Sequence, residues 1–364
     1  MKYRFDQIAF NSTKKKKPTE EDKDVYIGLE HLDSGCLTVT RWGADAAPTG
    51  EKLLMEKGDI LFGKRRAYQR KVAIAPFNGI FSAHGMVLRP NETVVTKEYF
   101  PFFMSSDQFM ERAVRISVGG LSPTINWSDL KVQEFELPSI EEQRELADKL
   151  WAAYRLKEAY KKLLAATDEM VKSQFIEMQA NSNCTNVLGD FIERCVPVRC
   201  GERELPVLSV TKDKAIVFQN ERFQSTVVSQ DTSNYVIVPR GYLVQGIHID
   251  ESNFGIQTLV DEGIVSPAYK LWKFNGQECV HELIEYYLRS PMAIKYFKRH
   301  FLGSTVPRRQ VIRKDDFLAM PLNLPSIDKQ KDFFAFFCQA DKSKFELRKS
   351  IEAIEAVIKS LINN

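Results

Sequence analysis

Five cationic side chains lie within eight residues in the first third of the chain, directly after a short apolar stretch bounded by glycines. They are Lys64, Arg65, Arg66, Arg70 and Lys71, and Tyr68 and Gln69 lie between them. Arginine can donate two hydrogen bonds to guanine in the major groove, glutamine can pair with adenine, and lysine more often binds phosphate. The segment therefore predicts a nucleic-acid contact. The alternative is a charged loop that only faces solvent.

A second set of polar residues occupies the matching place in the other half of the chain, with less positive charge. The contact residues predicted there are Gln245, His248, Ser252 and Asn253. Further contacts are predicted from cations that follow Pro307, namely Arg308, Arg309 and Arg313. Because the net charge of the 364 residues is only +3, a nucleic-acid surface must come from such local clusters.

Motifs for catalysis and metal binding are incomplete throughout the sequence. Residues 58–64 have the spacing of a phosphate-binding loop, but Arg65 stands where a Ser or Thr must reach magnesium. His281 and Glu282 begin like a zinc-protease helix, but no second His follows at the required spacing. The six cysteines form no CxxC pair. We therefore expect no catalytic residue, no bound metal and no cofactor.

The elements that must position the candidate residues come from an internal repeat. Residues 137–175 align without a gap on residues 324–362 at an offset of 187, and 11 of the 39 aligned pairs are identical. Both copies open with the residues LPSI. Identical pairs further along are Gln143 with Gln330 and Lys157 with Lys344.

Each copy is predicted to form one long helix. Ser139 and Ser326 are N-cap residue types that follow a proline, and Glu142 completes a capping box in the first copy. Lys329 replaces this glutamate in the second copy. Apolar residues recur at steps of three and four over about 40 residues, which corresponds to a rod of roughly 60 Å. The spacing predicts an antiparallel coiled coil between the two copies, and the alternative is two helices of ordinary bundles.

The segments that precede the two helices repeat more weakly. Residues 57–63 align on residues 240–246, and Gly119 and Pro123 align on Gly303 and Pro307. Strands are predicted in the first segment at residues 25–29, 37–40, 58–63, 72–75 and 80–88. The loops that follow residues 63 and 246 differ in chemistry, since the second carries two acids and neither Lys nor Arg. A framework kept twice with unlike loops suggests two related readers of two different targets.

The ordered set of motifs resembles the DNA specificity subunit of type I restriction–modification systems. The motifs are GDIL at residues 58–61, Ser82, the Gly119-Gly120 turn and LPSIEEQ at residues 137–143, and a matching set follows in the second half. The resemblance implies an α+β fold with an internal pseudo-twofold repeat. Two mixed target-recognition domains, at residues 1–136 and 181–323, would be separated by antiparallel coiled-coil spacer helices at residues 137–180 and 324–364.

The same resemblance implies the function and the partners. Each globular domain would read one half of a bipartite, asymmetric double-stranded DNA site. The helices would fix the unread gap and dock two adenine methyltransferase (modification) subunits and, through the complex, restriction endonuclease/translocase subunits. The chain itself would not be catalytic. Since the sequence begins at the first domain and ends at the second helix, we expect a compact member of the family.

Cellular location follows from what the sequence lacks. No apolar run reaches 18 residues, and the N-terminal segment has no signal-peptide core. We therefore expect a cytoplasmic protein with reduced thiols and no membrane contact. Two other functions stay open at this point. One is an assembly scaffold that binds partner subunits without sequence-specific DNA recognition, and the other is an enzyme with an unfamiliar site.

Overall fold

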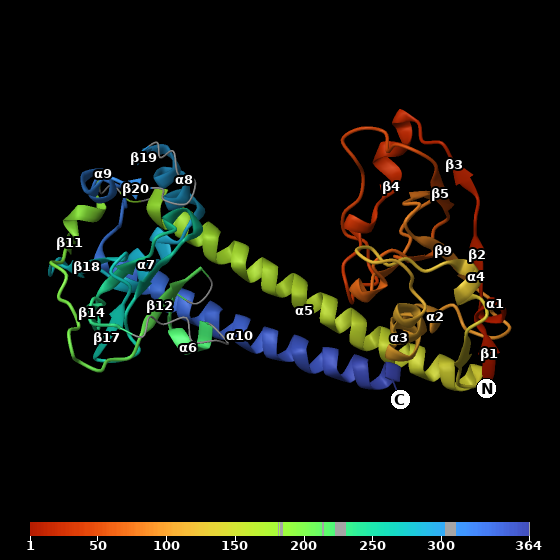
Figure 1. Ribbon diagram of the computed structural model, residues 1–364. Helices are drawn as coiled ribbons and strands as arrows, with labels where there is room; N and C mark the ends of the chain where they lie inside the picture. The colour runs from red at the N-terminus through yellow and green to blue at the C-terminus, as the bar shows by residue number, and fades with distance from the viewer. Residues whose placement is uncertain (181, 183–184, 213–214, 223–230, 303–310, 364) are drawn as a thin grey trace. The chain divides into compact units, whose positions relative to one another are not determined.

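The computed structural model describes residues 1–364 except 181, 183–184, 213–214, 223–230, 303–310 and 364 (Figure 1). The chain divides into two compact units. Unit 1 comprises Met1–Leu164 and Glu346–Asn364, and unit 2 comprises Ala165–Phe345. Each unit therefore contains one globular segment and parts of both long helices. The predicted α+β class is confirmed.

Unit 1 is built on a four-stranded antiparallel sheet of order β2-β9-β6-β7. Its strands are β1 (Lys2–Arg4), β2 (Ala9–Ser12), β3 (Lys15–Lys16), β4 (Tyr26–Ile27), β5 (Lys52–Met55), β6 (Ile60–Phe62), β7 (Val72–Ile74), β8 (Gly79–Phe81), β9 (Met86–Pro90) and β10 (Glu134–Glu136). Its shorter helices are α1 (Phe5–Ile8), α2 (Phe100–Ser105), α3 (Asp107–Arg115) and α4 (Trp127–Leu130). Buried aromatic rings of α2 and α3, such as Phe103 and Phe109, pack 5.7 Å apart in the core below the sheet.

Unit 2 contains a four-stranded sheet of order β11-β18-β15-β16. Its strands are β11 (Ile192–Arg194), β12 (Leu208–Thr211), β13 (Ala215–Phe218), β14 (Val236–Pro239), β15 (Leu243–Gln245), β16 (Phe254–Ile256), β17 (Glu262–Val265), β18 (Lys270–Phe274), β19 (Phe301–Leu302) and β20 (Val311–Ile312). Its shorter helices are α6 (Gln219–Arg222), α7 (His281–Leu288), α8 (Pro291–His300) and α9 (Lys314–Leu318).

The two sheets have equivalent strand orders. In each, the strand that follows the repeated glycine turn, β6 or β15, lies between its hairpin partner and a strand from further along the chain. A pair of helices then follows in each unit, α2 with α3 and α7 with α8, before one of the two long helices begins. The weak sequence repeat of the globular segments is thus a repeat of secondary structure.

The long helices are α5 (Ile140–Ala180) and α10 (Ile327–Asn363). The predicted capping box is present at the start of α5, where Ser139 N–H donates to Glu142 at 2.8 Å and Glu142 N–H donates to Ser139 Oγ at 3.3 Å. The hydrogen bonds from Ser139 lower the pKa of Glu142. Residues of the predicted apolar spacing are buried in both helices. They are Leu150, Val171, Phe333, Ala340 and Ile351.

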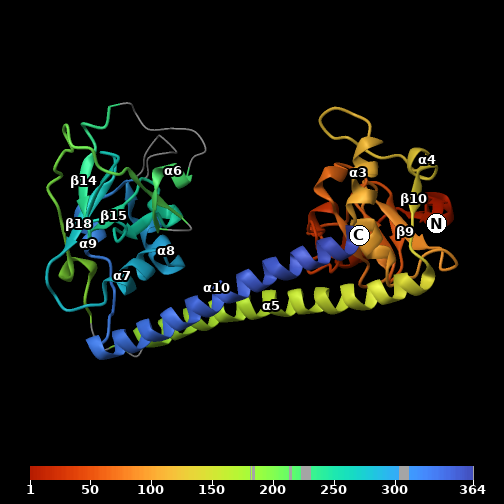
Figure 2. The ribbon, with the colours of Figure 1, turned by 90° about the horizontal axis from the view of Figure 1, so that it is seen from below.

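The two helices pack antiparallel inside each unit (Figures 1 and 2). In unit 1 the first part of α5, with Ala147 and Leu150, meets the last part of α10, with Ile358 and Ile362. In unit 2 the last part of α5, with Phe175, meets the first part of α10, where the ring of Phe333 lies 5.5 Å away. The unit boundaries therefore fall within both helices rather than at their ends.

One predicted strand is wrong. Residues 37–40 form no strand, because the backbone N–H groups of Leu37 and Thr38 donate to the hydroxyl of Tyr154 at 2.9 and 3.1 Å. Burial raises the pKa of this hydroxyl, which keeps it protonated. An isolated bridge of Thr38 with Ile74 links the segment to β7, and the N–H groups of Leu37 and Thr38 bind α5 instead of a neighbouring strand.

The repeated glutamine joins each long helix to its own globular segment. Gln143 Oε1 accepts from Thr96 N–H at 2.8 Å, and its amide donates to Pro138 and Val94 carbonyls at 3.0 Å. Gln330 makes the equivalent bonds to Val280 N–H at 3.0 Å and to the Pro325 carbonyl at 2.8 Å. Both side chains are almost fully buried, at 0% and 2% exposure. This explains why the residue is identical in the two copies.

Replacing Gln143 by Leu is expected to destabilise unit 1 by about 1–3 kcal/mol, because buried Thr96 N–H and the Val94 carbonyl would lose their partner. Denaturant unfolding of the full chain measures this, with the first transition assigned by hydrogen exchange of unit 1. Gln174→Leu, at an exposed position of α5, is the matched control and should change stability by less than about 0.5 kcal/mol. Equal effects of the two substitutions would contradict the assigned role.

Candidate nucleic-acid interface

The cationic segment at residues 64–71 connects β6 to β7 and is held in one conformation by its backbone. Arg66 and Arg70 both adopt left-handed backbone angles, with φ of 57° and 50°, at the two ends of a short 3₁₀ turn, Ala67–Gln69. Ala67 is buried and anchors the turn in the core. The Arg66 N–H donates to the carbonyl of Pro123 at 2.7 Å. A loop fixed in this way presents its outward side chains with little further loss of conformational entropy.

The cations of this loop divide into two groups. Arg65 and Arg66 are exposed beside Tyr68, whose side chain is 55% exposed. Arg70, in contrast, forms an ion pair with Asp107 at 2.5 Å, and Lys71 donates to the carbonyl of Leu29 at 2.6 Å. The first group is available to a ligand, and the second holds the loop against α3 and the preceding segment. Gln69 is half-buried between them.

Two further segments lie beside the exposed arginines. The Arg65 N–H donates to the carbonyl of His84 at 3.2 Å, and Arg66 Nε donates to Ser122 Oγ at 3.2 Å. Burial lowers the pKa of His84, as do the charges of Arg65, Lys64 and Lys52 in turn. Burial, and then the charge of Lys15, also lowers the pKa of Lys64. We call Lys64, Arg65, Arg66 and His84 the cationic patch. His84 is the member that sequence reasoning missed, since a single His carries no motif.

The corresponding loop of unit 2 follows β15 and has a different composition. Gln245 is 4% exposed and accepts a hydrogen bond from Trp272 Nε1 at 2.9 Å, so it serves the core in this structure. Ser252 and Asn253 are also buried, at 7% and 8% exposure. His248 is exposed, next to Asp250 and Glu251.

Arg313 is exposed at the start of α9. The predicted contacts Arg308 and Arg309 lie outside the described residues. Among the predicted residues of unit 2 that the structure describes, His248 and Arg313 are therefore the ones that face solvent. The contact predictions for this unit stay predictions.

A family model described as the type I restriction modification DNA specificity domain matches residues 7–166, which include the whole cationic patch. This part of the chain is thus similar to the DNA specificity domain of type I restriction–modification systems. The predicted resemblance to type I specificity subunits is thereby confirmed, and its DNA-specificity domain holds the loop that the sequence identified by charge alone.

Known relatives agree with this assignment. The type I restriction enzyme EcoDI specificity subunit of Escherichia coli is 28% identical over 149 residues, which cover 39% of this chain and 32% of the relative. A type I restriction–modification S subunit from M. genitalium has the same fold with a TM-score of 0.57 at 12% identity. That alignment covers 100% of this chain and 94% of the other.

A second solved structure gives the same result. It comes from work on complex assembly and conformational transition of the type I R-M system, and it aligns with a TM-score of 0.55 at 15% identity. The alignment covers 100% of this chain and 96% of the other. At these identities the two structures establish the fold of both halves of the chain.

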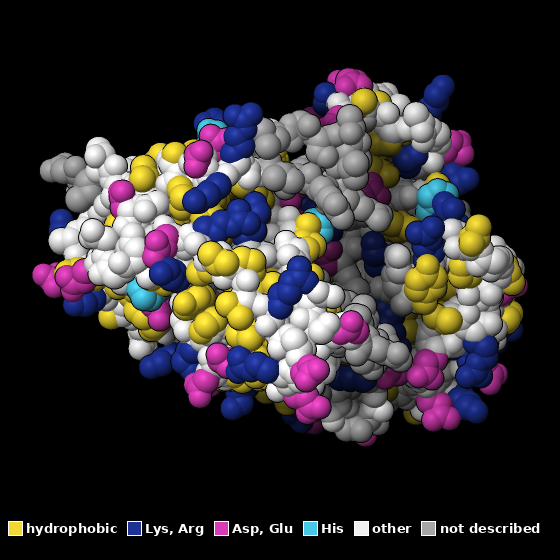
Figure 3. Space-filling view, turned by 60° about the vertical axis from the view of Figure 1, so that its left-hand side comes forward, with side chains coloured by type: hydrophobic (Ala, Val, Ile, Leu, Met, Phe, Trp, Pro, Cys, Tyr) yellow, Lys and Arg dark blue, Asp and Glu magenta, His cyan; other side chains and the backbone are white. Residues whose placement is uncertain are grey.

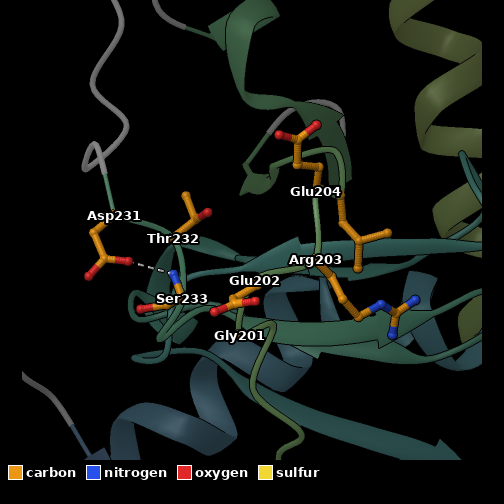
Figure 4. Close-up of a pocket in the computed structure, with 8 residues that line it drawn as sticks. Gly201, Glu202, Arg203, Glu204, Asp231, Thr232 and Ser233 are labelled. Carbon is orange, nitrogen blue, oxygen red and sulfur yellow. Dashed lines mark hydrogen bonds between the residues drawn. The ribbon is translucent and has the colours of Figure 1, made fainter.

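One pocket of unit 2 does not suit a phosphate backbone. A pocket of about 490 Å³ in unit 2 is lined by Glu202, Glu204 and Asp231, and Asp231 accepts a hydrogen bond from Ser233 N–H at 2.9 Å (Figure 4). Its carboxylates would repel a nucleic acid. On the face shown in Figure 3, Lys and Arg side chains lie among Asp and Glu side chains, so this face carries both signs of charge side by side.

The described parts of the chain show neither a metal-binding cluster nor a membrane-spanning helix. Within the described residues, no group of three or more His, Cys, Asp or Glu is arranged to hold a metal ion. None of the helices in the described parts of the chain combines the length and apolar character that a membrane span requires.

DNA binding through the cationic patch is expected to strengthen as the pH falls from 7.5 to 5.5. The pKa of His84 lies below its usual 6.5 in the free protein, and a nearby phosphate would raise it, so binding takes up a proton. We expect a gain of several-fold, up to about tenfold for a rise of one pKa unit. Fluorescence anisotropy with duplex DNA measures this for the native chain and for His84→Gln. Equal pH dependence in both would contradict the contact.

Proposed function

We propose that the chain is the non-catalytic specificity subunit of a type I restriction–modification complex. Each globular segment would bind one half of a bipartite, asymmetric double-stranded DNA site. The observation that carries this proposal is the repeat of one framework with unlike loops at the same position. The strand pairs β6–β7 and β15–β16 are equivalent, but the connection in unit 1 is cationic and that in unit 2 contains Asp250 and Glu251.

In unit 1 the proposed contacts start from the cationic patch. Arg65 and Arg66 would reach guanine edges or phosphates, Lys64 a phosphate, and Tyr68 an apolar or sugar surface. Gln69, Arg70 and Lys71 would hold the loop and approach DNA from its far end. In unit 2 His248 and Arg313 are exposed, and Ser252 and Asn253 support the loop. Different side chains at equivalent positions would select different bases.

The long helices would set the gap between the two half-sites. We propose globular domains at residues 1–136 and 181–323, and spacer helices at residues 137–180 and 324–364 that form an antiparallel coiled coil with pseudo-twofold symmetry. Each helix begins in one unit and ends in the other. A stiff connection of this kind joins two modest half-site affinities into one through effective concentration.

Two modification subunits would dock on these helices, and restriction subunits would join through the complex. A groove of about 890 Å³ in unit 2, lined by α5, α7, α8 and α10, supports this docking. Aromatic residues of the groove include Tyr286, Phe334 and Phe337. Cys338 of this groove is matched by Trp151 in the sequence repeat. In unit 1 the ring of Trp151 packs on the ring of Phe102, with 4.9 Å between their centres, whereas the smaller Cys338 leaves this space open in unit 2. A side chain of the modification subunit would take the place of this indole.

DNA binding by the reconstituted complex should depend steeply on salt. If about five phosphates are neutralised, affinity for duplex DNA should fall several hundredfold between 50 and 200 mM salt, because bound counterions are released. Anisotropy titrations at four salt concentrations give the slope. A specific complex whose affinity does not change with salt would contradict the proposed contacts.

A further inference from the structure

Lys157 is a buried cation on the face of α5 that packs against α10. Its side chain is 5% exposed, and its ammonium lies 4.9 Å from the ring centre of Tyr154. It donates to the carbonyl of Gly35 at 3.2 Å and lies 3.9 Å from Glu355 of α10. Burial lowers the pKa of Lys157, and the charge of Glu355 opposes this.

Lys344 occupies the equivalent place on α10, within unit 2. Its side chain is 12% exposed and forms an ion pair with Asp168 of α5 at 3.1 Å. A second contact, with Asp341 of its own helix, measures 3.4 Å. Each long helix thus contributes one largely buried lysine and one carboxylate to the pairing.

The two ion pairs are related by the sequence repeat. Lys157 and Lys344 are 187 positions apart, and so are Asp168 and Glu355. The lysine of one helix therefore meets the carboxylate of the other in both units, with the same antiparallel register. Since α5 and α10 are each one continuous helix, a single antiparallel register serves both ion pairs, and the repeat places a lysine and a carboxylate at matching points of it.

Neighbouring registers offer these lysines no carboxylate on the facing helix. A slip by one heptad, which would keep apolar residues in contact, places Lys157 opposite Arg348 or Ile362. The same slips place Lys344 opposite Lys161 or Phe175. A slip by four residues brings Lys157 to Ile351 or Lys359. Each alternative either removes the facing carboxylate from a largely buried ammonium or brings two cations together, and both are unfavourable.

We propose that Lys157 and Lys344 are the register-determining residues of the helix pair, through their carboxylate partners Glu355 and Asp168. A charged residue in an otherwise apolar contact face lowers stability but selects one alignment. Together with the function proposed above, this makes them specificity-determining residues, since the register sets the gap between half-sites. The assignment of the register itself does not depend on DNA binding.

Cysteine crosslinking of the full chain tests the register directly. Ala153→Cys is combined with Lys359→Cys, which lies opposite in the observed register, or with Glu352→Cys, which lies opposite after a heptad slip. A short bifunctional thiol reagent is added, and crosslinked peptides are identified by mass spectrometry, which separates them from the native cysteines. In the native chain we expect the 153–359 product to dominate.

The decisive variant replaces both buried lysines, Lys157→Met and Lys344→Met, which keeps side-chain length and removes the charge. We expect the slipped 153–352 product to increase about tenfold or more, with no loss of thermal stability. Lys162→Met with Lys349→Met is the matched control, because these lysines are also related by the repeat and are exposed. A slipped product that stays at the native level in the lysine-to-methionine variant would overturn the proposal.

A charge exchange keeps the test valid if that variant folds poorly. Reversal of both carboxylates, Asp168→Lys and Glu355→Lys, should raise the slipped product, and adding Lys157→Glu and Lys344→Glu should return it to the native level. Failure of this rescue in folded protein would also overturn the register assignment. A slipped register with an unchanged gap in the methylated DNA motif would instead contradict the proposed function.

Discussion

Replacing Arg65 and Arg66 by glutamate is expected to abolish modification by the assembled complex at its DNA site. The two side chains are exposed on a loop whose backbone is held by Pro123, His84 and the buried Ala67, so the substitution changes charge without removing a core contact. Each arginine contact with DNA contributes about 1–3 kcal/mol. Loss of two, with added repulsion, should weaken binding roughly 100-fold or more. Anisotropy and methylation of plasmid DNA measure both effects.

A matched control is available at the other end of the same strand. Lys57 lies just before β6, whereas Lys64 lies just after it. The control pair is Lys57 with Lys97, and both side chains are exposed. Reversal of this pair of lysines alters net charge equally and should leave modification within about twofold. Unchanged modification after reversal of Arg65 and Arg66, in a complex that still assembles, would favour an assembly scaffold over a DNA-reading subunit.

Lengthening both long helices by one heptad should lengthen the gap in the recognised DNA site without changing either half-site. Seven residues between 162 and 163 of α5, and seven at the equivalent place between 349 and 350 of α10, add about 10 Å. This corresponds to at most about three base pairs at 3.4 Å each. Both lysine ion pairs stay within their own units, so the register in each is kept. Methylation mapping reads the new gap.

The same insertion in α5 alone provides the control. One lengthened helix cannot keep Lys157 beside Glu355 and Lys344 beside Asp168 together, so modification should be lost. A complex that methylates the original motif after both insertions would show that the helices do not set the gap.

Much of the fold could be predicted because its strongest signals are local. Apolar residues at steps of three and four, in long runs without Gly or Pro, predicted both long helices. The capping box of Ser139 and Glu142 predicted the start of the first helix. The repeat followed from the sequence alone. The strand predicted at residues 37–40 was wrong, because the composition of this segment carries no information about Tyr154. That residue is more than 110 positions away, and its hydroxyl accepts hydrogen bonds from two N–H groups of the segment.

The candidate site was predicted by charge, and its details depend on contacts between distant residues. Arg70 and Lys71 look equivalent to Arg65 and Arg66 in sequence, but Asp107 and the Leu29 carbonyl engage them. Gln245 has the chemistry of a base reader, yet its position in the central strand β15 buries it against Trp272. His84 joins the patch only through folding. Composition cannot separate such roles, because each is set by a partner far along the chain.

The most direct test of the central claim is adenine-methylation mapping across the genome of a host that expresses this chain with its modification subunit. The account predicts one bipartite motif, with two unlike half-sites at a fixed gap, and loss of recognition of one half-site when the loop of unit 1 is exchanged. A continuous or palindromic motif would contradict independent reading by two domains. An assembled complex that leaves no new methylation would contradict DNA recognition by this chain.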